Sequence, residues 1–435
     1  MRFLTVILLC LPNTTGAAWK LPHSAFGNVE SPRGNQIPIG LENDDEIGTF
    51  GASSFAGLRT FANLPFVDCF SDQDTRDHKY DIAIFGASHD TWLYAHLNEC
   101  GRQRPAVQER GLALQLYGQV ANGRALGNGA SIQARRPPGI DHAQNPLQDW
   151  ATVVDCGDAR LTWLDNTASL KRLDKAHTVI SGRAAANSSV SSTPRILTLG
   201  GDHTTTLSAL RSTYRRWGPV AVIHFDSHID TWDPAVLGKF PRGGVNLGEQ
   251  YAEKVIFLLQ EAEYPSMPNF VRGLNHGTFL HIAHEEHLIL NNSIHAGIRA
   301  PLVRRKGDLR NDVRCGFEIV TARDLDKFGA HGVISKIKER VGDSRVYVSV
   351  DIDVLDPAYA PATGTAEPGG WSTRELLTVL DGLEGLSIVG ADVVEVAPAY
   401  DNNGETTVLA AAEIAYSLID LMVLTPVRSK ADDDA

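Results

Sequence analysis

Short, continuous runs of apolar residues recur along the chain from residue 80 onward, with little alternation of polar side chains. Such runs are typical of strands that are buried on both faces, as in a parallel sheet. Helical patterns lie between several of them, and this alternation predicts an α/β fold with a mostly parallel sheet of about eight strands and helices on both faces. The predicted strands are residues 82–85, 152–154, 196–199, 220–225, 294–298, 317–320, 346–350 and 388–394.

Two of the predicted helices carry clear local signals. Ser372 is followed three residues later by Glu375, which is the spacing of a capping box, just before an apolar pattern that begins at Leu376. Residues 405–422 form a long, alanine-rich amphipathic pattern. In parallel sheets of this kind, ligands bind beyond the carboxyl ends of the strands, so residues directly after each apolar run are the first candidates for function.

The first part of the chain does not follow this rhythm. Residues 1–17 contain Arg2, an apolar run and a small-residue stretch, which predicts a signal peptide cleaved near Ala17 and a secreted protein. The alternative is a buried N-terminal strand. Residues 18–79 are rich in glycine, proline and polar side chains and predict a loosely structured N-terminal extension.

The main domain is then expected over residues 80–428, followed by an acidic tail at 429–435. Inside this domain, residues 92–150 and 238–273 are long stretches without clear strand periodicity, which is uncommon in compact domains. We interpret them as a shifted reading frame and a retained intron in the gene model, rather than as evolved insertions.

Composition and charge narrow the class of protein. Hydrophobic residues make up 43% and charged residues 21%, which excludes a disordered chain, and no apolar run after the N-terminus is expected to span a bilayer. The chain has 40 Lys and Arg against 52 Asp and Glu, a net charge of −12. This charge argues against a nucleic-acid partner and favours a cationic one.

Cysteines and sequons matter if the protein is exported. Removal of the signal peptide would also remove Cys10 and leave Cys69, Cys100, Cys156 and Cys315. Four cysteines allow up to two disulfides in an oxidising compartment, and their spacing leaves the pairing open. Asn187 and Asn291 each begin a glycosylation sequon.

Three of the predicted strands lead directly into residues that can bind metal ions. These are Asp226, His228 and Asp230 after 220–225, Asp351 and Asp353 after 346–350, and His203 after 196–199. In extended chain, alternate residues project from one face, so we expect each Asp/His series to converge. A single Asp-x-Asp is more often a solvated loop or a helix cap, but three such clusters at strand ends favour a metal site. Carboxylates with imidazoles suit manganese better than copper or a cysteine-bound structural zinc.

Other candidates lie near this predicted site. Glu395 follows the run 388–394, where a carboxylate could receive a cationic group by paired hydrogen bonds. His276 precedes three histidines at helical spacing, which lack the spacing of a zinc-protease helix and are interpreted as a solvated helix face: His281, His284 and His287. We find no GxSxG elbow, P-loop or dinucleotide fingerprint.

Taken together, these motifs resemble the ureohydrolase family, which includes arginase and agmatinase, and in particular the agmatinase branch with its secreted fungal members. The resemblance covers roughly residues 81–427 and implies a three-layer arginase-like fold that assembles as a homo-oligomer, a trimer or a hexamer. The stretches that carry it are residues 200–203, 224–232, 349–370 and 392–398.

The resemblance also implies a mechanism. It predicts two Mn²⁺ ions and an agmatinase that cleaves the guanidinium group of agmatine, a small cationic substrate, to putrescine and urea by attack of a metal-bridging hydroxide. Asp230 would stabilise the tetrahedral intermediate and help protonate the leaving amine, Glu395 would orient the guanidinium, and His276 would shuttle protons. One ion would be held by His203, Asp226, Asp230 and Asp351, and the other by His228, Asp226, Asp351 and Asp353.

The substrate is less well determined by the motifs. Arginases resemble one another in a Ser-Gly-Asn stretch where this chain has residues 272–275, whereas 276–279 look like the agmatinase form. An Arg-Pro-Gly loop typical of relatives is missing after Asp90 and Thr91. Two alternatives stay open: a guanidinobutyrase or other ω-guanidino acid hydrolase, with Arg272 or Arg299 near the substrate carboxylate, and a catalytically inactive binding protein.

Overall fold

The computed structural model describes residues 60–89, 146–161, 166–237 and 273–433. Several predictions therefore lie outside the described residues. They concern the signal peptide, the extension up to residue 59, Asp90 and Thr91, Cys100, Arg272, residues 92–145 and 238–272 of the two atypical stretches, and residues 434–435 of the tail.

A single sheet of eight parallel strands forms the centre of the described chain. The strand order is β2-β1-β3-β8-β7-β4-β5-β6, and every pairing is parallel. Each strand overlaps one predicted run, so the α/β fold class is confirmed. The bounds are Ile82–Ala87 (β1), Val153–Asp158 (β2), Arg195–Gly200 (β3), Ala221–Phe225 (β4), Ser293–Ile298 (β5), Phe317–Thr321 (β6), Arg345–Asp351 (β7) and Ser387–Val394 (β8).

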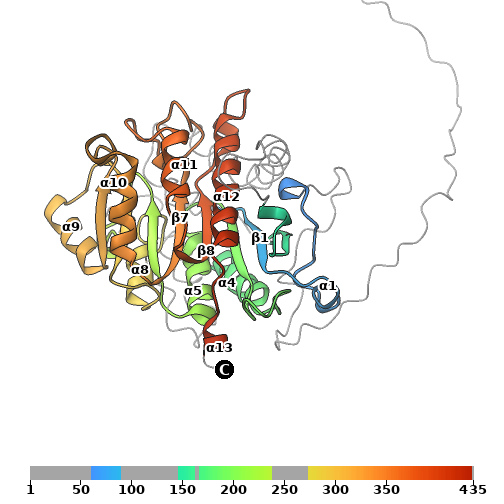
Figure 1. Ribbon diagram of the computed structural model, residues 1–435. Helices are drawn as coiled ribbons and strands as arrows, with labels where there is room; N and C mark the ends of the chain where they lie inside the picture. Colours follow the sequence, from blue (N-terminus) through green and yellow to red (C-terminus); the bar gives the residue numbers. More distant parts are fainter. Residues whose placement is uncertain (1–59, 90–145, 162–165, 238–272, 434–435) are drawn as a thin grey trace, which may run out of the picture. The chain divides into compact units, whose positions relative to one another are not determined.

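Helices cover both faces of the sheet, as predicted (Figure 1). Helices α10, α11 and α12 pack on one face and α4, α5 and α8 on the other. The bounds are Asp72–Asp77 (α1), Asn166–Ser181 (α4), Thr205–Trp217 (α5), Pro234–Leu237 (α6), Phe279–Glu285 (α8), Arg305–Arg314 (α9), Asp324–Val341 (α10), Thr373–Asp381 (α11), Thr406–Leu424 (α12) and Lys430–Asp433 (α13). The capping box of Ser372 and Glu375 at the start of α11 is formed by both hydrogen bonds.

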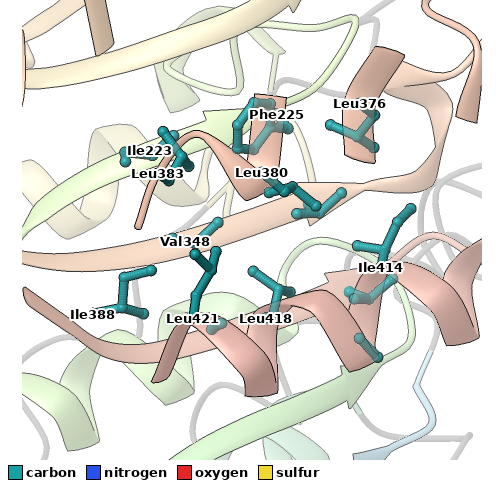
Figure 2. Close-up of a cluster of buried hydrophobic side chains, with 14 of the residues drawn as sticks. Ile223, Phe225, Val348, Leu376, Leu380, Leu383, Ile388, Ile414, Leu418 and Leu421 are labelled. Atoms are coloured by element: carbon teal, nitrogen blue, oxygen red, sulfur yellow. The ribbon is translucent and has the colours of Figure 1, made fainter. Parts of the chain in front are cut away.

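Alternate residues of the central strands enter two separate cores. Figure 2 shows Phe225 and Val348 among leucines and isoleucines of α11 and α12. Val222 of β4 and Tyr347 of β7 pack on the opposite face, with α5 and α8. Since burying each large aliphatic side chain contributes about 1.5–3 kcal/mol, both faces favour apolar residues. This double burial explains the continuous apolar runs in the sequence.

Helix α12 corrects one expectation. It has 19 residues with a mean hydropathy of 1.8, so by length and composition it is one helix that could cross a membrane. The prediction that no run after the N-terminus has this property is therefore wrong. In the structure, 83% of the apolar window is buried, because the helix packs against β8, β3 and α11.

Residues 60–79 correct another expectation, since they are not loosely structured. Phe66 forms a parallel bridge with Asp155, and the Asp155 carboxylate accepts a hydrogen bond from Phe61 N at 2.8 Å. A disulfide joins Cys69 to Cys156 on β2, while Cys315 is a buried free thiol. These contacts attach the end of the predicted extension to the edge of the sheet.

The strand register explains how distant sequence motifs meet. Phe225 of β4 pairs with Val350 of β7, Val350 pairs with Val393 of β8, and Val393 pairs with Leu199 of β3. These four residues form one row across the sheet. The chemistry-bearing residues that follow them therefore emerge at the same edge, from four adjacent strands.

Candidate metal centre

A buried group of four carboxylates and three imidazoles lies at this edge of the sheet. We call it the strand-end cluster, and its members are His203, His224, Asp226, His228, Asp230, Asp351 and Asp353. All of them are buried except His228, which is half-buried. The structure thus brings together all six residues that the resemblance assigns to metal binding, and adds His224.

The local backbone differs from the extended chain that the sequence predicted. Strand β4 ends at Phe225, before Asp226, and Asp230 has a left-handed conformation with φ of 50°. A short 3-10 helix, Ile352–Val354, begins directly after Asp351. The period-two argument for a common face is therefore wrong in its geometry. The side chains still converge because the chain turns beyond the last ladder hydrogen bond.

His203 is the centre of the first half of the cluster. Its Nδ1 lies 3.1 Å from Asp226 Oδ2, 3.2 Å from Asp230 Oδ2 and 3.4 Å from Asp351 Oδ2. The ring stacks on Phe279, with 4.6 Å between centroids, and this contact restricts its rotation.

The second half of the cluster surrounds His228. Its Nδ1 lies 3.0 Å from Asp353 Oδ2 and 3.3 Å from Asp226 Oδ1. Backbone groups orient the acids, since Ser227 N donates to Asp353 Oδ1 and Asp353 N donates to Asp351 Oδ1, at 3.0 and 2.8 Å. Asp226 therefore faces both halves with different oxygens, as a carboxylate shared by two ions would.

Sequence reasoning did not assign a role to His224. It lies on β4 two residues before Asp226, and its Nε2 is 3.1 Å from Asp226 Oδ2 and 3.9 Å from Asp230 Oδ2. The sequence places this histidine inside a buried strand and two residues before Asp226, a pattern that fits a core position as well as a site residue.

The chemistry of the cluster fits cations. Within the described ranges, the ion-pair partners of its four carboxylates are histidines, and no lysine or arginine pairs with them. Three buried atoms that face one another form no hydrogen bond to the described chain: His203 Nδ1, His224 Nε2 and Asp226 Oδ2. Buried carboxylates need compensation, and imidazole with carboxylate is a suitable donor set for divalent ions.

The pKa shifts of Asp230 and His228 reflect the same surplus of negative charge. Burial and the neighbouring Asp226 raise the pKa of Asp230 to about 7. Burial acts to lower the pKa of His228, but Asp353 and Asp226 raise it to about 12. Positive charge is thus strongly favoured at the positions between the carboxylates.

A hydrogen-bond chain behind His203 fixes its ring. Ser349 Oγ donates to Asp392 Oδ1 at 2.7 Å and therefore accepts from His203 Nε2, also at 2.7 Å. Tyr347 OH donates to the other oxygen of Asp392 at 2.8 Å. Nε2 thus carries a proton, and Nδ1 is the nitrogen that faces the carboxylates. Such outer contacts orient the histidine ligands of metal sites.

Glu395 lies beside the cluster at the end of β8. Its Oε1 accepts a hydrogen bond from His203 N at 2.9 Å, and its own N donates to Gly201 O at 2.8 Å. Burial and the nearby Asp351 raise the pKa of Glu395. A side chain at Gly201 would collide with the His89 backbone, at 1.8 Å from its carbonyl oxygen, so this close approach requires glycine.

Among the other candidate residues, His276 interacts electrostatically with the cluster, whereas the remaining histidines belong to no potential metal-binding group among the described residues. His276 is half-buried, and burial lowers its pKa to about 4, with charged members of the cluster also acting on it. His281 and His284 are half-buried and His287 is exposed, and none joins a potential metal-binding group among the described residues. Arg299 donates to backbone carbonyls, including those of Asp353 and Glu367 at 2.6 and 2.7 Å.

Comparisons with known proteins agree with this geometry. The profile of the arginase family matches residues 111–420. The protein named "putative agmatinase 1" of Schizosaccharomyces pombe is 42% identical over 385 residues, covering 86% of this chain and 84% of that protein. The chain belongs to the arginase family.

Two solved structures share the fold. Proclavaminate amidinohydrolase from Streptomyces clavuligerus has a TM-score of 0.59 and 29% identity, covering 86% of this chain and 99% of that one. A hypothetical agmatinase from Burkholderia thailandensis has a TM-score of 0.56 and 27% identity, covering 88% and 95%. The arginase-like fold is thus confirmed. The family member described here is a metal-dependent amidinohydrolase, which hydrolyses carbon–nitrogen bonds of guanidino groups.

Proposed function

We propose that this enzyme is a secreted, manganese-dependent agmatinase that hydrolyses agmatine to putrescine and urea. The observation that carries the proposal is the strand-end cluster, in which four carboxylates face one another with only imidazoles between them. Carboxylate oxygen with imidazole nitrogen is a donor set that suits manganese. Similarity to agmatinases supports the choice of substrate.

Two overlapping groups of residues would hold the ions. One group is His203, Asp226, Asp230 and Asp351, and the other is His228, Asp226, Asp351 and Asp353. Ions bound there would lower the pKa of water, so that hydroxide is available near neutral pH to attack the guanidinium carbon. Phe279 and the Ser349 hydroxyl keep the His203 ring in place for this task.

The remaining residues of the chain would bind the substrate and move protons. Glu395 would accept hydrogen bonds from the guanidinium, since one of its oxygens is already oriented by His203 N. Asp230, which lies 3.2 Å from His203 Nδ1 inside the cluster, would help to protonate the leaving amine. His276, which is half-buried and neutral near pH 7 because burial lowers its pKa, would relay protons between the site and solvent.

Two observations bear on the tail of the substrate. An ω-guanidino acid would need a cation for its carboxylate, but the Arg299 guanidinium already donates to five carbonyl oxygens, those of Gly297, Asp353, Val354, Leu355 and Glu367. This argues against Arg299 as that cation, while the other candidate, Arg272, lies outside the described residues. The likeness to proclavaminate amidinohydrolase favours a second candidate, an ω-guanidino acid hydrolase.

The experiment is urea release from agmatine, arginine and 4-guanidinobutyrate with added Mn²⁺, using Asp353→Ala as the inactive control. We expect agmatine to give the highest kcat/KM. A higher value for 4-guanidinobutyrate would favour the second candidate, and a higher value for arginine would contradict both. No urea from any of the three substrates would favour an inactive binding protein.

Secretion has its own support and test. The Cys69–Cys156 disulfide suits an oxidising compartment, and the sequon residue Asn291 is exposed. Expression with the natural N-terminus in a secreting eukaryotic host should release protein into the medium, with a mass that falls on treatment with an N-glycosidase. Retention of the protein inside the cells would contradict secretion.

A further inference from the structure

A second chain of buried polar groups runs from the strand-end cluster to helix α9. His224 Nδ1 lies 2.8 Å from His295 Nδ1 on β5, and His295 Nε2 lies 3.0 Å from Asp312 Oδ1 on α9. All three residues are at most 1% exposed. This series of hydrogen-bonded side chains thus connects α9, which is remote in sequence, with the carboxylate of Asp226.

The geometry of this series orients both histidine rings. The Asp312 carboxylate accepts from His295 Nε2, so that nitrogen carries a proton. His295 Nδ1 and His224 Nδ1 then share one hydrogen bond, which turns His224 Nε2 toward Asp226 Oδ2, 3.1 Å away. The His295 ring is held by stacking on Phe317, with 4.0 Å between centroids.

The same Asp312 oxygen also contacts Thr231, the residue that follows Asp230 of the cluster. Thr231 Oγ1 donates to Asp312 Oδ1 at 2.6 Å, and Thr231 directly follows Asp230. Asp230 has a positive φ of 50°, which is strained for an aspartate and needs support from its surroundings. Asn311 on α9 adds a hydrogen bond to Thr231 O, and Leu280 N donates to Asp230 O at 3.2 Å.

We propose that Asp312 is a positioning residue for the metal centre. It fixes the orientation of the His295 and His224 rings next to Asp226, and it holds Thr231 so that Asp230 keeps its left-handed conformation. One side chain on α9 thereby controls two carboxylates without touching a metal ion. This inference rests on the proposed function, because it assumes that the strand-end cluster binds manganese.

The test measures Mn²⁺ affinity by competition with a chelator, together with the fold by circular dichroism. Asp312→Ala should weaken Mn²⁺ binding by about 10–100-fold, as loss of an outer-shell partner does. Asp312→Asn keeps an oxygen acceptor and should restore most of the affinity. Thr231→Val and His295→Phe each break one branch, and the double variant should bind no more weakly than Asp312→Ala.

Asp308 provides the matched control. It lies one turn earlier on α9, is equally buried, and accepts from Trp232 Nε1 at 3.3 Å and from Arg304 N at 2.6 Å. Asp308→Ala should lower stability but leave Mn²⁺ affinity within about 3-fold, a smaller loss than that of an outer-shell partner. Equal weakening by Asp308→Ala and Asp312→Ala, or failure of Asp312→Asn to restore binding, would overturn the proposal.

Failure of the positioning role of Asp312 differs in its outcome from failure of the proposed function. Unchanged Mn²⁺ affinity in Asp312→Ala, with a wild-type protein that binds Mn²⁺ and releases urea, would overturn the positioning role alone. A wild-type protein that binds no Mn²⁺ would overturn both this inference and the proposed function.

Discussion

The strand-end cluster and a second polar cluster, between α4, α5 and the sheet, are both buried but differ in chemistry. We call the second the α4–α5 cluster, and it consists of His177, Ser181, Thr198 and Ser212, around a small cavity that also touches Tyr347. It contains no carboxylate. Ser212 Oγ donates to His177 O at 3.1 Å and lies 3.0 Å from Ser181 Oγ.

The difference lies in the balance of donors and acceptors. In the α4–α5 cluster, three buried atoms form no hydrogen bond to the described chain: His177 Nδ1, His177 Nε2 and Thr198 Oγ1. Hydroxyl and neutral imidazole groups both donate and accept, so water in the cavity can satisfy them without a cation. Ionised carboxylates only accept, and the strand-end cluster has four carboxylates with no lysine or arginine paired to them in the described chain. Burial alone therefore does not mark a functional site, whereas an uncompensated surplus of acceptors does.

The largest expected difference between the clusters is in catalysis. Asp353→Ala should remove one metal ion by elemental analysis and lower kcat/KM by about 10³-fold, the loss typical of a group that acts on reacting charge. In the α4–α5 cluster, Ser212→Ala should leave metal content and kcat/KM unchanged and lower stability by about 1 kcal/mol. An unchanged rate in Asp353→Ala would refute the binuclear assignment.

Removal of Mn²⁺ should lower the free energy of unfolding, and this loss should depend on the strand-end cluster but not on the α4–α5 cluster. Free Mn²⁺ at about a thousand times its Kd should add about 4 kcal/mol to the free energy of unfolding, because only the folded state binds it. Chemical denaturation with EDTA or with Mn²⁺ measures this difference. The same gain should persist in Ser212→Ala and shrink in Asp353→Ala. A gain of the same size in both variants would place the stabilising ion elsewhere.

Substitutions of Ser349 and Tyr347, which support the His203 ring, should have an intermediate effect on Mn²⁺ affinity. Ser349→Ala removes the acceptor of His203 Nε2 and should weaken Mn²⁺ binding by about 10–100-fold. Tyr347 connects the clusters, since its ring lines the cavity and its hydroxyl donates to Asp392. Tyr347→Phe should therefore have a smaller effect of the same sign, measured by chelator competition. Ser349 contacts His203 directly, whereas Tyr347 acts on it through Asp392 and Ser349. A larger loss of Mn²⁺ affinity in Tyr347→Phe than in Ser349→Ala would contradict this arrangement.

His177 of the α4–α5 cluster should contribute to the loss of stability in acid. Burial lowers the pKa of His177 to about 3 from 6.5. Below pH 6.5 the unfolded state binds a proton that the folded state does not, so stability falls as the pH decreases toward 3. Between pH 7 and 5 this loss is about 2 kcal/mol. In His177→Leu, urea denaturation of the metal-free protein should show a loss smaller by about that amount, and an equal loss would exclude His177 as its source.

Particular residues show how far the sequence could predict this protein. The apolar runs predicted all eight strands, and the Asp and His residues after three of them predicted the members of the site. The backbone at Asp230 and at Ile352–Val354 was not predicted, because the chain leaves the extended conformation as soon as ladder hydrogen bonds stop. His224 was missed, since a histidine in an apolar run is equally consistent with a core position.

The order of strands and helices, and which residues follow each strand, could be predicted from local periodicity. The pairing of β4 with β7, across more than a hundred residues of chain, and the contacts of Asp312 with His295 and Thr231 become visible only in the folded structure. Strand pairing and helix docking depend on contacts between distant segments, and local residue patterns do not specify which segments meet.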